Sequence, residues 1–267
     1  MKKSILITGG NGYIAQSIFK ALNHKYDITL LTKADCDLFN QEQVNYSRFF
    51  DKHYDVLIHT AVVGGSRLKP DSTEIMDQNL QMYYNLLNKS RFYSKFIHFG
   101  SGAEIIDTPH YYYGLSKKII AESIKNKPNF YNLRIYGVFD ENEADTRFIK
   151  SNILRYIKHE PMEVYFNKQM DFIYMPDLIK LVEYYIDNED LEKEVDCVYG
   201  NTVSPYLNTI TKTINNLDEY KVEINFGAEY SPSYGCNEGS VYATDILDFW
   251  IGLEEGIKQV YKKLKHA

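Results

Sequence analysis

A tyrosine and a lysine stand four residues apart at Tyr113 and Lys117, and Ser101 stands twelve residues before the tyrosine. On a helix, residues four apart share one face. An ammonium close to a phenol favours the phenolate, so it lowers the phenol's pKa from its usual value near ~10. A phenol tuned in this way can pass a proton to or from an alcohol or carbonyl oxygen near neutral pH. The serine hydroxyl could donate a hydrogen bond to the same oxygen. Because the chain holds 24 tyrosines, the surrounding elements must decide whether these residues act together.

A glycine-rich turn follows the first apolar run. Residues 4–8 are apolar and read as a strand, residues 9–15 contain Gly9, Gly10 and Gly12, and an amphipathic stretch then indicates a helix. Glycines at such a turn let the backbone approach a pyrophosphate, which the amides at the helix N-terminus can hold. We therefore predict dinucleotide binding by Gly9, Asn11, Gly12, Tyr13 and Ile14.

The end of the second predicted strand bears on which dinucleotide is used. Thr32 and Lys33 follow the apolar residues 28–31, where a site specific for NAD would carry an acid for the ribose hydroxyls. A hydroxyl and an ammonium suit a 2′-phosphate, so the sequence predicts NADP (as NADPH). Asp35 lies close by and keeps NAD open as the less favoured cofactor.

Strand-like and helix-like stretches alternate through the first half. Apolar runs at 55–59, 95–99 and 131–135 are separated by helix-like stretches at 73–90 and 113–125. This pattern predicts an α/β fold, a Rossmann-type doubly wound parallel sheet. Ligands of such sheets gather beyond the carboxyl ends of the strands, so Gly9, Ala61 and Ser101 should be neighbours. We assign residues 1–160 to a dinucleotide-binding domain and residues 161–267 mainly to a smaller α/β substrate-binding part that is interleaved with it.

Composition argues against other classes of protein. The net charge of −6 gives no reason to expect nucleic acid or an anionic membrane as a partner, and no apolar stretch approaches the ~20 residues of a membrane span. The three cysteines form neither a metal-spaced set nor a disulfide framework. We expect a cytoplasmic protein without a bound metal.

Taken together, these motifs resemble the extended short-chain dehydrogenase/reductase family, which includes nucleotide-sugar epimerases, dehydratases and ketoreductases. The resemblance rests on segments 8–15, 37–38, 59–61, 113–122 and 171–178 and on Asn79. It implies that Asp37 and Leu38 lie by the adenine and that Thr60, Ala61 and Val62 line the cofactor. Ser101, Tyr113 and Lys117 would be catalytic, and Tyr113 and Lys117 would also contact the cofactor. The resemblance further implies a nucleotide-sugar substrate, a homodimer, and substrate contacts from Ser101, Gly102, Tyr113, Tyr136 and Arg147.

Within this family, segments 61–65 and 99–101 look most like the GDP-L-fucose synthase branch. That branch is NADP-dependent, and it epimerises a 4-keto-6-deoxy sugar with a cysteine and a histidine before reducing the ketone. Ala103 and Arg147 stand at those two positions here, and neither can shuttle protons. The sequence therefore predicts reduction of the C4 ketone of a nucleotide-linked 4-keto-6-deoxy sugar by NADPH, without epimerase activity.

Two alternatives remain open. A nucleotide-sugar 4-epimerase with tightly bound NAD would need the same serine, tyrosine and lysine and no further acid. A non-catalytic dinucleotide-binding regulatory protein could share the fold, although such proteins commonly lose the Tyr-Lys pair. The family's arginine before the Asp-Phe-Ile-Tyr segment is replaced by Met170, so phosphate contacts must come from elsewhere, with Arg147, Arg155 and Lys168 as candidates.

Overall fold

The computed structural model describes residues 2–65, 71–106, 111–200, 204–228, 234–236 and 240–266. Close contacts divide the chain into two compact units, one of Met1–Arg134 and Val182–Val195 and the other of Ile135–Leu181 and Asp196–Ala267. By this criterion residues 135–160, which we assigned to the dinucleotide-binding part, lie in the second unit.

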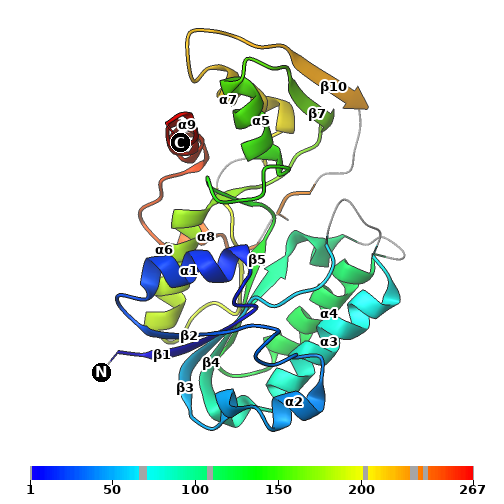
Figure 1. Ribbon diagram of the computed structural model, residues 1–267, viewed down its shortest axis with the longest axis vertical. Helices are drawn as coiled ribbons and strands as arrows, with labels where there is room; N and C mark the ends of the chain where they lie inside the picture. Colours follow the sequence, from blue (N-terminus) through cyan, green and yellow to red (C-terminus); the bar gives the residue numbers. More distant parts are fainter. Residues whose placement is uncertain are drawn as a thin grey trace. The chain divides into compact units, whose positions relative to one another are not determined.

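The first unit is built on a six-stranded sheet with the order β2-β1-β3-β4-β5-β9 (Figure 1). Its strands are β1 (Ser4–Thr8), β2 (Asp27–Leu31), β3 (Tyr54–His59), β4 (Tyr93–Ser101), β5 (Phe130–Ile135) and β9 (Glu194–Asp196). Strand β1 pairs in parallel with β2 and β3, and β3 pairs in parallel with β4. In register, Thr8 lies beside both Leu31 and His59, and His59 lies beside His98. Strands β1, β2 and β3 therefore end level, and β4 continues for three residues to Ser101 at the same end of the sheet. The predicted α/β fold with a parallel sheet is confirmed.

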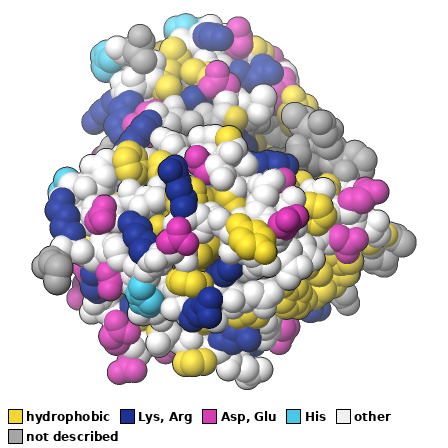
Figure 2. All heavy atoms as spheres, turned by 60° about the horizontal axis from the view of Figure 1, so that its bottom comes forward, with side chains coloured by type: hydrophobic (Ala, Val, Ile, Leu, Met, Phe, Trp, Pro, Cys, Tyr) yellow, Lys and Arg dark blue, Asp and Glu magenta, His cyan; other side chains and the backbone are white. Residues whose placement is uncertain are grey.

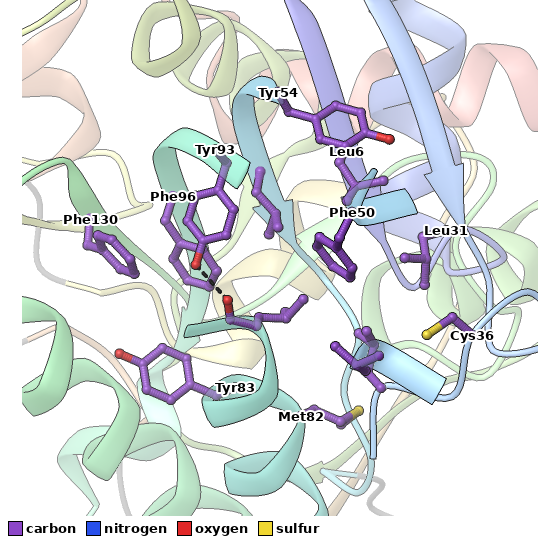
Figure 3. Packing of buried hydrophobic residues seen from close by; sticks show 14 of the residues in the cluster. Leu6, Leu31, Cys36, Phe50, Tyr54, Met82, Tyr83, Tyr93, Phe96 and Phe130 are labelled. Atoms are coloured by element: carbon purple, nitrogen blue, oxygen red, sulfur yellow. Dashed lines mark hydrogen bonds between the residues drawn. The ribbon is translucent and has the colours of Figure 1, made fainter. Parts of the chain in front are cut away.

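Helices connect these strands. They are α1 (Tyr13–Leu22), α2 (Gln41–Asn45), α3 (Thr73–Leu87) and α4 (Tyr112–Lys125), with the short 3₁₀ helices η1 (Arg48–Phe50), η2 (Ser90–Phe92) and η3 (Gly102–Ile105). One face of the sheet packs on α3 and α4 through a buried cluster that includes Leu57, Phe96, Tyr83, Leu86 and Ile120. Figure 3 shows part of this core, with the Tyr93 hydroxyl donating to the Leu86 carbonyl oxygen at 2.9 Å. This packing fixes α4 on that face of the sheet.

The second unit has its own core. Its elements are β6 (Val138–Phe139), α5 (Phe148–Ile157), β7 (Met162–Phe166), β8 (Ile173–Tyr174), α7 (Leu207–Asn215), β10 (Ile224–Ala228), α8 (Ala243–Ile246) and α9 (Leu253–Lys265). Strands β7 and β10 pair in parallel, as do β6 and β8. Helix α6 (Met175–Asp187) runs from this unit into the first. The buried Asp177 carboxylate accepts the backbone N–H groups of Ile251 and Gly252, which ties the start of α9 to α6.

Within the part of the chain that the structure describes, no helix is long and apolar enough to cross a membrane. The same residues contain no group of three or more His, Cys, Asp or Glu side chains that could hold a metal ion. On the face drawn in Figure 2, basic and acidic side chains are interspersed. That face presents no extended field of one sign that would attract a polyanion.

Candidate active site

The glycine turn lies between β1 and α1, as the sequence predicts. Gly9 follows β1 with φ +68°, a left-handed conformation that glycine adopts without strain. A Cβ on Gly9 would lie 2.8 Å from the backbone of Ala61. Gly12 is the N-cap of α1, and its N–H donates to the Gly9 carbonyl oxygen at 2.7 Å. The turn thus brings bare backbone close to the loop after β3, which is the cradle that a pyrophosphate needs.

A pocket of about 340 Å³ opens beside this turn. Nine of the predicted cofactor residues line it: Gly9, Asn11, Gly12, Lys33, Asp37, Leu38, Thr60, Ala61 and Val62. Its lining includes none of three further candidates, Tyr13, Ile14 and Thr32, nor the catalytic candidates Tyr113 and Lys117. Sequence reasoning missed six lining residues: Leu31, Cys36, Phe39, Val63, Gln78 and Met82. An apolar wall beside a glycine turn fits an adenine and its ribose.

Charged and polar residues at the end of β2 are already paired with one another. The Asp35 carboxylate accepts the Thr32 N–H at 3.0 Å and the Thr32 hydroxyl at 2.6 Å, and these bonds lower the pKa of Asp35. The Lys33 Nζ lies 3.4 Å from the Asp37 carboxylate, and the Lys33 side chain is 84% exposed. Thr32 is therefore turned toward an acid, whereas Lys33 is a cation at the pocket that a 2′-phosphate could meet.

Lys117 is buried beneath Tyr113 on α4. Its Nζ donates to the Phe99 carbonyl oxygen at 2.7 Å and lies 5.9 Å from the centre of the Tyr113 ring. Burial lowers the pKa of Lys117 to about 8, against the opposing attraction of Glu104. The Lys117 ammonium and the Tyr113 phenol are therefore close together, as predicted. At neutral pH most of the lysine remains protonated.

Two buried histidines lie behind Lys117. His59 and His98 stack with ring centres 5.5 Å apart, and the Thr8 hydroxyl is 2.8 Å from His59 Nδ1. Burial, together with the charge of Lys117, lowers the pKa of His59 to about 3 and that of His98 well below its usual value. Both imidazoles are therefore neutral and add no positive charge beside the ammonium, which is stabilised by the opposite charge of Glu104.

Ser101 is buried at the point where β4 ends and η3 begins. Its Oγ accepts the Ala103 N–H at 3.2 Å, and its own N–H donates to Glu104 Oε1 at 2.7 Å. Helix α4 packs directly on this turn, because a Cβ on Gly114 would lie 2.6 Å from the Ala103 carbonyl oxygen. The contact brings Gly102 and Ser101 next to the first turn of α4, where Tyr113 stands. The loop after β3 reaches the same place, since a Cβ on Gly65 would lie 2.9 Å from Tyr113 Cζ.

The remaining substrate candidates belong to the second unit. Tyr136 is buried, with its ring edge-on to that of Tyr234 at 5.7 Å. Arg147 is the N-cap of α5, and its Nε lies 4.0 Å from the Glu143 carboxylate. Met170 packs in the hydrophobic core of this unit. This apolar environment explains why the position holds methionine and not arginine. The substrate contacts of Tyr136 and Arg147, and the phosphate contacts considered for Arg147, Arg155 and Lys168, stay predictions.

A parallel sheet with a glycine turn, a pocket at its carboxyl edge and a Tyr-Lys pair whose lysine is buried defines a dinucleotide-binding enzyme domain. The model of the NAD dependent epimerase/dehydratase family matches residues 5–200, and the chain belongs to that family. It is an NAD(P)-dependent enzyme of the oxidoreductase type, which confirms the predicted family and enzyme class. Nicotinamide dinucleotides are the cofactors of the family.

Individual proteins show how far this similarity extends. CDP-abequose synthase from Yersinia pseudotuberculosis is 23% identical over 242 residues, covering 81% of this chain and 84% of that protein. The solved GDP-mannoheptose C4 reductase from Campylobacter jejuni, with NADP bound, has a TM-score of 0.78 at 16% identity, over 99% of this chain and 98% of that one. A GDP-L-fucose synthetase from Naegleria fowleri has a TM-score of 0.75 at 16% identity, over 97% and 92% of the two chains. Solved 4-epimerases match equally well, so these structural similarities establish the fold and do not separate reductases from epimerases.

Proposed function

We propose that the protein reduces the C4 ketone of a nucleotide-linked 4-keto-6-deoxy sugar with NADPH and does not epimerise it. The observation that carries this proposal is Lys117, buried beside Tyr113 at the sheet edge where Ser101 also lies. The names of the similar proteins support the substrate class, because they include a GDP-sugar C4 reductase and a CDP-sugar synthase.

When bound, NADPH would supply the hydride for the carbonyl carbon. Tyr113 then gives its proton to the carbonyl oxygen, so that hydride and proton together yield the alcohol. The Ser101 hydroxyl donates a hydrogen bond to the same oxygen while negative charge develops there. Lys117, which is mostly protonated at neutral pH, stabilises the phenolate left on Tyr113 and can hold the nicotinamide ribose. The resulting phenolate is reprotonated from solvent before the next turnover.

Epimerisation at the carbons that flank the ketone would need a second acid–base pair beside the sugar ring. Ala103, at the position where the related synthases carry a cysteine, is fully buried and has no proton to exchange. Arg147 remains charged at every physiological pH and cannot act as a base. The proposal is therefore a simple reduction by the Ser-Tyr-Lys set.

Deuterium distinguishes reduction from epimerisation. We would incubate the protein in D₂O with NADPH and GDP-, dTDP-, UDP- and CDP-linked 4-keto-6-deoxy sugars, follow NADPH absorbance, and examine the product by NMR. The expected result is NADPH consumption with one nucleotide and no deuterium at the carbons that flank C4. Deuterium at a flanking carbon would contradict the absence of epimerase activity. No consumption with any sugar would contradict the reductase proposal itself.

A nucleotide-sugar 4-epimerase with tightly bound NAD is the second candidate. It is favoured by Asp35, a carboxylate at the end of β2 that holds Thr32, because an acid in this region is typical of an NAD site. Purified protein that carries NAD through gel filtration and interconverts C4 epimers without consuming NADPH would establish this activity in place of reduction.

We also propose that the protein is a homodimer through α3 and α4. Tyr84 on α3 and Leu115 on α4 are large apolar side chains that the chain leaves exposed. Light scattering on the purified protein should give twice the chain mass, and Leu115→Glu should give the mass of one chain.

A further inference from the structure

A buried carboxylate that the proposed mechanism does not use lies directly under the catalytic serine. Glu104 is the last but one residue of η3, and its side chain is 2% exposed. One carboxylate oxygen accepts the Ser101 N–H at 2.7 Å, and the other accepts from Asn132 Nδ2 at 3.1 Å and from Arg134 Nε at 3.0 Å. All three partners donate hydrogens and Arg134 is a cation, which favours the ionised form of the carboxylate that accepts them.

Ser101 and Glu104 hold each other reciprocally. The serine Oγ accepts backbone N–H groups of η3 while the Glu104 side chain accepts the serine N–H, the arrangement known as a capping box. A hydroxyl oxygen that accepts N–H groups acts toward a further group as a donor through its O–H. The box thus sets both the place of the serine oxygen and its role as a donor.

The acid in turn is fixed by β5. Asn132 and Arg134 both lie on that strand, and Arg134 is 9% exposed on its side chain and also pairs with Glu194. A Cβ on Gly100 would lie 2.2 Å from Glu104 Oε1 and 2.4 Å from Asn132 Oδ1. The carboxylate and the Asn132 amide therefore occupy the space that a side chain at residue 100 would need.

We propose that Glu104 is a positioning residue for Ser101: paired with Arg134, its carboxylate fixes the serine backbone and directs the serine hydroxyl toward the substrate oxygen. This inference rests on the proposed function, because it assigns the serine the part of a hydrogen-bond donor in the reduction. Glu104 acts in this proposal through Ser101 and has no part of its own in the proton or hydride transfer.

A double-mutant cycle tests whether Glu104 acts through Ser101. Displacing a positioned group by about 1 Å can cost about 10²-fold in rate, so Glu104→Gln should lower kcat by up to about that factor. In the Ser101→Ala background the same substitution should change kcat by less than about twofold, because residues that act as a unit are non-additive. Equal losses in both backgrounds, or a kcat for Glu104→Gln like that of the unsubstituted enzyme, would overturn the proposal.

A second measurement needs neither sugar nor cofactor. Hydrogen exchange of the Ser101 amide should accelerate at least about tenfold in Glu104→Gln, since the charged acceptor is lost. Glu122→Gln, on the exposed face of α4 where it pairs with Lys125 at 2.7 Å, removes the same charge and should change neither exchange nor kcat. Unchanged Ser101 exchange in Glu104→Gln would overturn the proposal.

Two further controls keep the outcomes distinct. If Glu104→Gln does not fold, Glu104→Asp keeps the charge and should still slow kcat when the serine is present and not in the Ser101→Ala background; additive losses would again overturn the proposal. If the unsubstituted enzyme reduces none of the sugars, the proposed function fails, whereas the exchange measurement still decides whether Glu104 holds Ser101.

Discussion

Two buried carboxylates brace loops that follow strands, one in each unit. Glu104 holds the turn after β4, and Glu143 holds the turn after β6, where its carboxylate accepts the Lys150 N–H at 3.2 Å. The two acids differ in their arginines. Arg134 lies 3.0 Å from Glu104 and is 9% exposed, whereas Arg147 lies 4.0 Å from Glu143 and is 47% exposed.

Because of this difference, we expect Glu104 to keep its negative charge in the folded protein and Glu143 to be protonated. Burial raises the pKa of both acids. A buried cation at hydrogen-bond distance offsets much of the energetic cost of burying a carboxylate, whereas a distant, hydrated cation offsets little of it. Burial raises the pKa of Glu143 to about 8, and the nearby Asp140 carboxylate adds to the rise, although Arg147 and Lys150 act to lower it. Glu104 should therefore stay ionised beside the serine, while Glu143 should be neutral at physiological pH.

The largest expected effect tests whether Glu104 lies beside a reaction centre that contains Tyr113. Tyr113→Phe removes the proposed proton donor and leaves the ring in place. We expect turnover to fall by about 10²–10⁴-fold, the contribution of a positioned general acid, with an unchanged Kd for NADPH in a fluorescence titration. Near-normal turnover of this variant would remove Tyr113 from the mechanism. Glu104, like Glu143, would then have only a structural role.

Removing each arginine compares the two acids directly. Arg134→Met leaves Glu104 buried without its cation, and we expect a loss of about 3–5 kcal/mol in the free energy of unfolding. Arg147→Met removes a half-exposed partner and should cost less than about 1 kcal/mol. Urea unfolding at one pH measures both. Equal losses would show that the two ion pairs are alike.

The pH dependence of stability should come from Glu143. Its folded pKa of about 8 lies above the ordinary value of 4.5, so the folded state binds the proton more tightly than the unfolded state. The stability is therefore fully present below the unfolded pKa and decreases as pH rises toward 8. We expect a loss of roughly 3 kcal/mol between pH 5 and 8, from about 1.4 kcal/mol per unit. Glu143→Gln should abolish this loss in urea unfolding across that range, and a variant that keeps the full slope would contradict the assignment.

Local patterns predicted the elements of the first unit well. The helix predicted at 113–125 is observed at Tyr112–Lys125, and the strand predicted at 55–59 is observed at Tyr54–His59, because apolar spacing and strand ends are local features. The predicted helix at 73–90 ends at Leu87, and residues 90–92 form a separate 3₁₀ turn.

Contacts between distant segments could not be predicted in the same way. Gln78 and Met82 reach the pocket from α3, and only the packing of that helix on the sheet places them there. Glu104 is an intermediate case. The Ser-x-x-Glu spacing at 101–104 is a capping-box signal that the sequence does contain, but the pairing with Arg134 depends on which strand lies beside β4.

The smallest expected effect concerns Lys33, whose charge is exposed to solvent, whereas that of Glu104 is buried. Lys33 pairs only loosely with Asp37 at the cofactor pocket, so Lys33→Gln should hardly change stability. If Lys33 meets a 2′-phosphate, the variant should bind NADPH about tenfold more weakly, a loss of ~1.4 kcal/mol, and NADH with unchanged affinity. Added salt should shrink the difference, because exposed charges are screened. Lys52→Gln, which removes an equivalent charge outside the pocket, serves as the control. Equal weakening of NADPH and NADH binding would mean that Lys33 does not read the phosphate, and the choice of cofactor would then rest with Asp35.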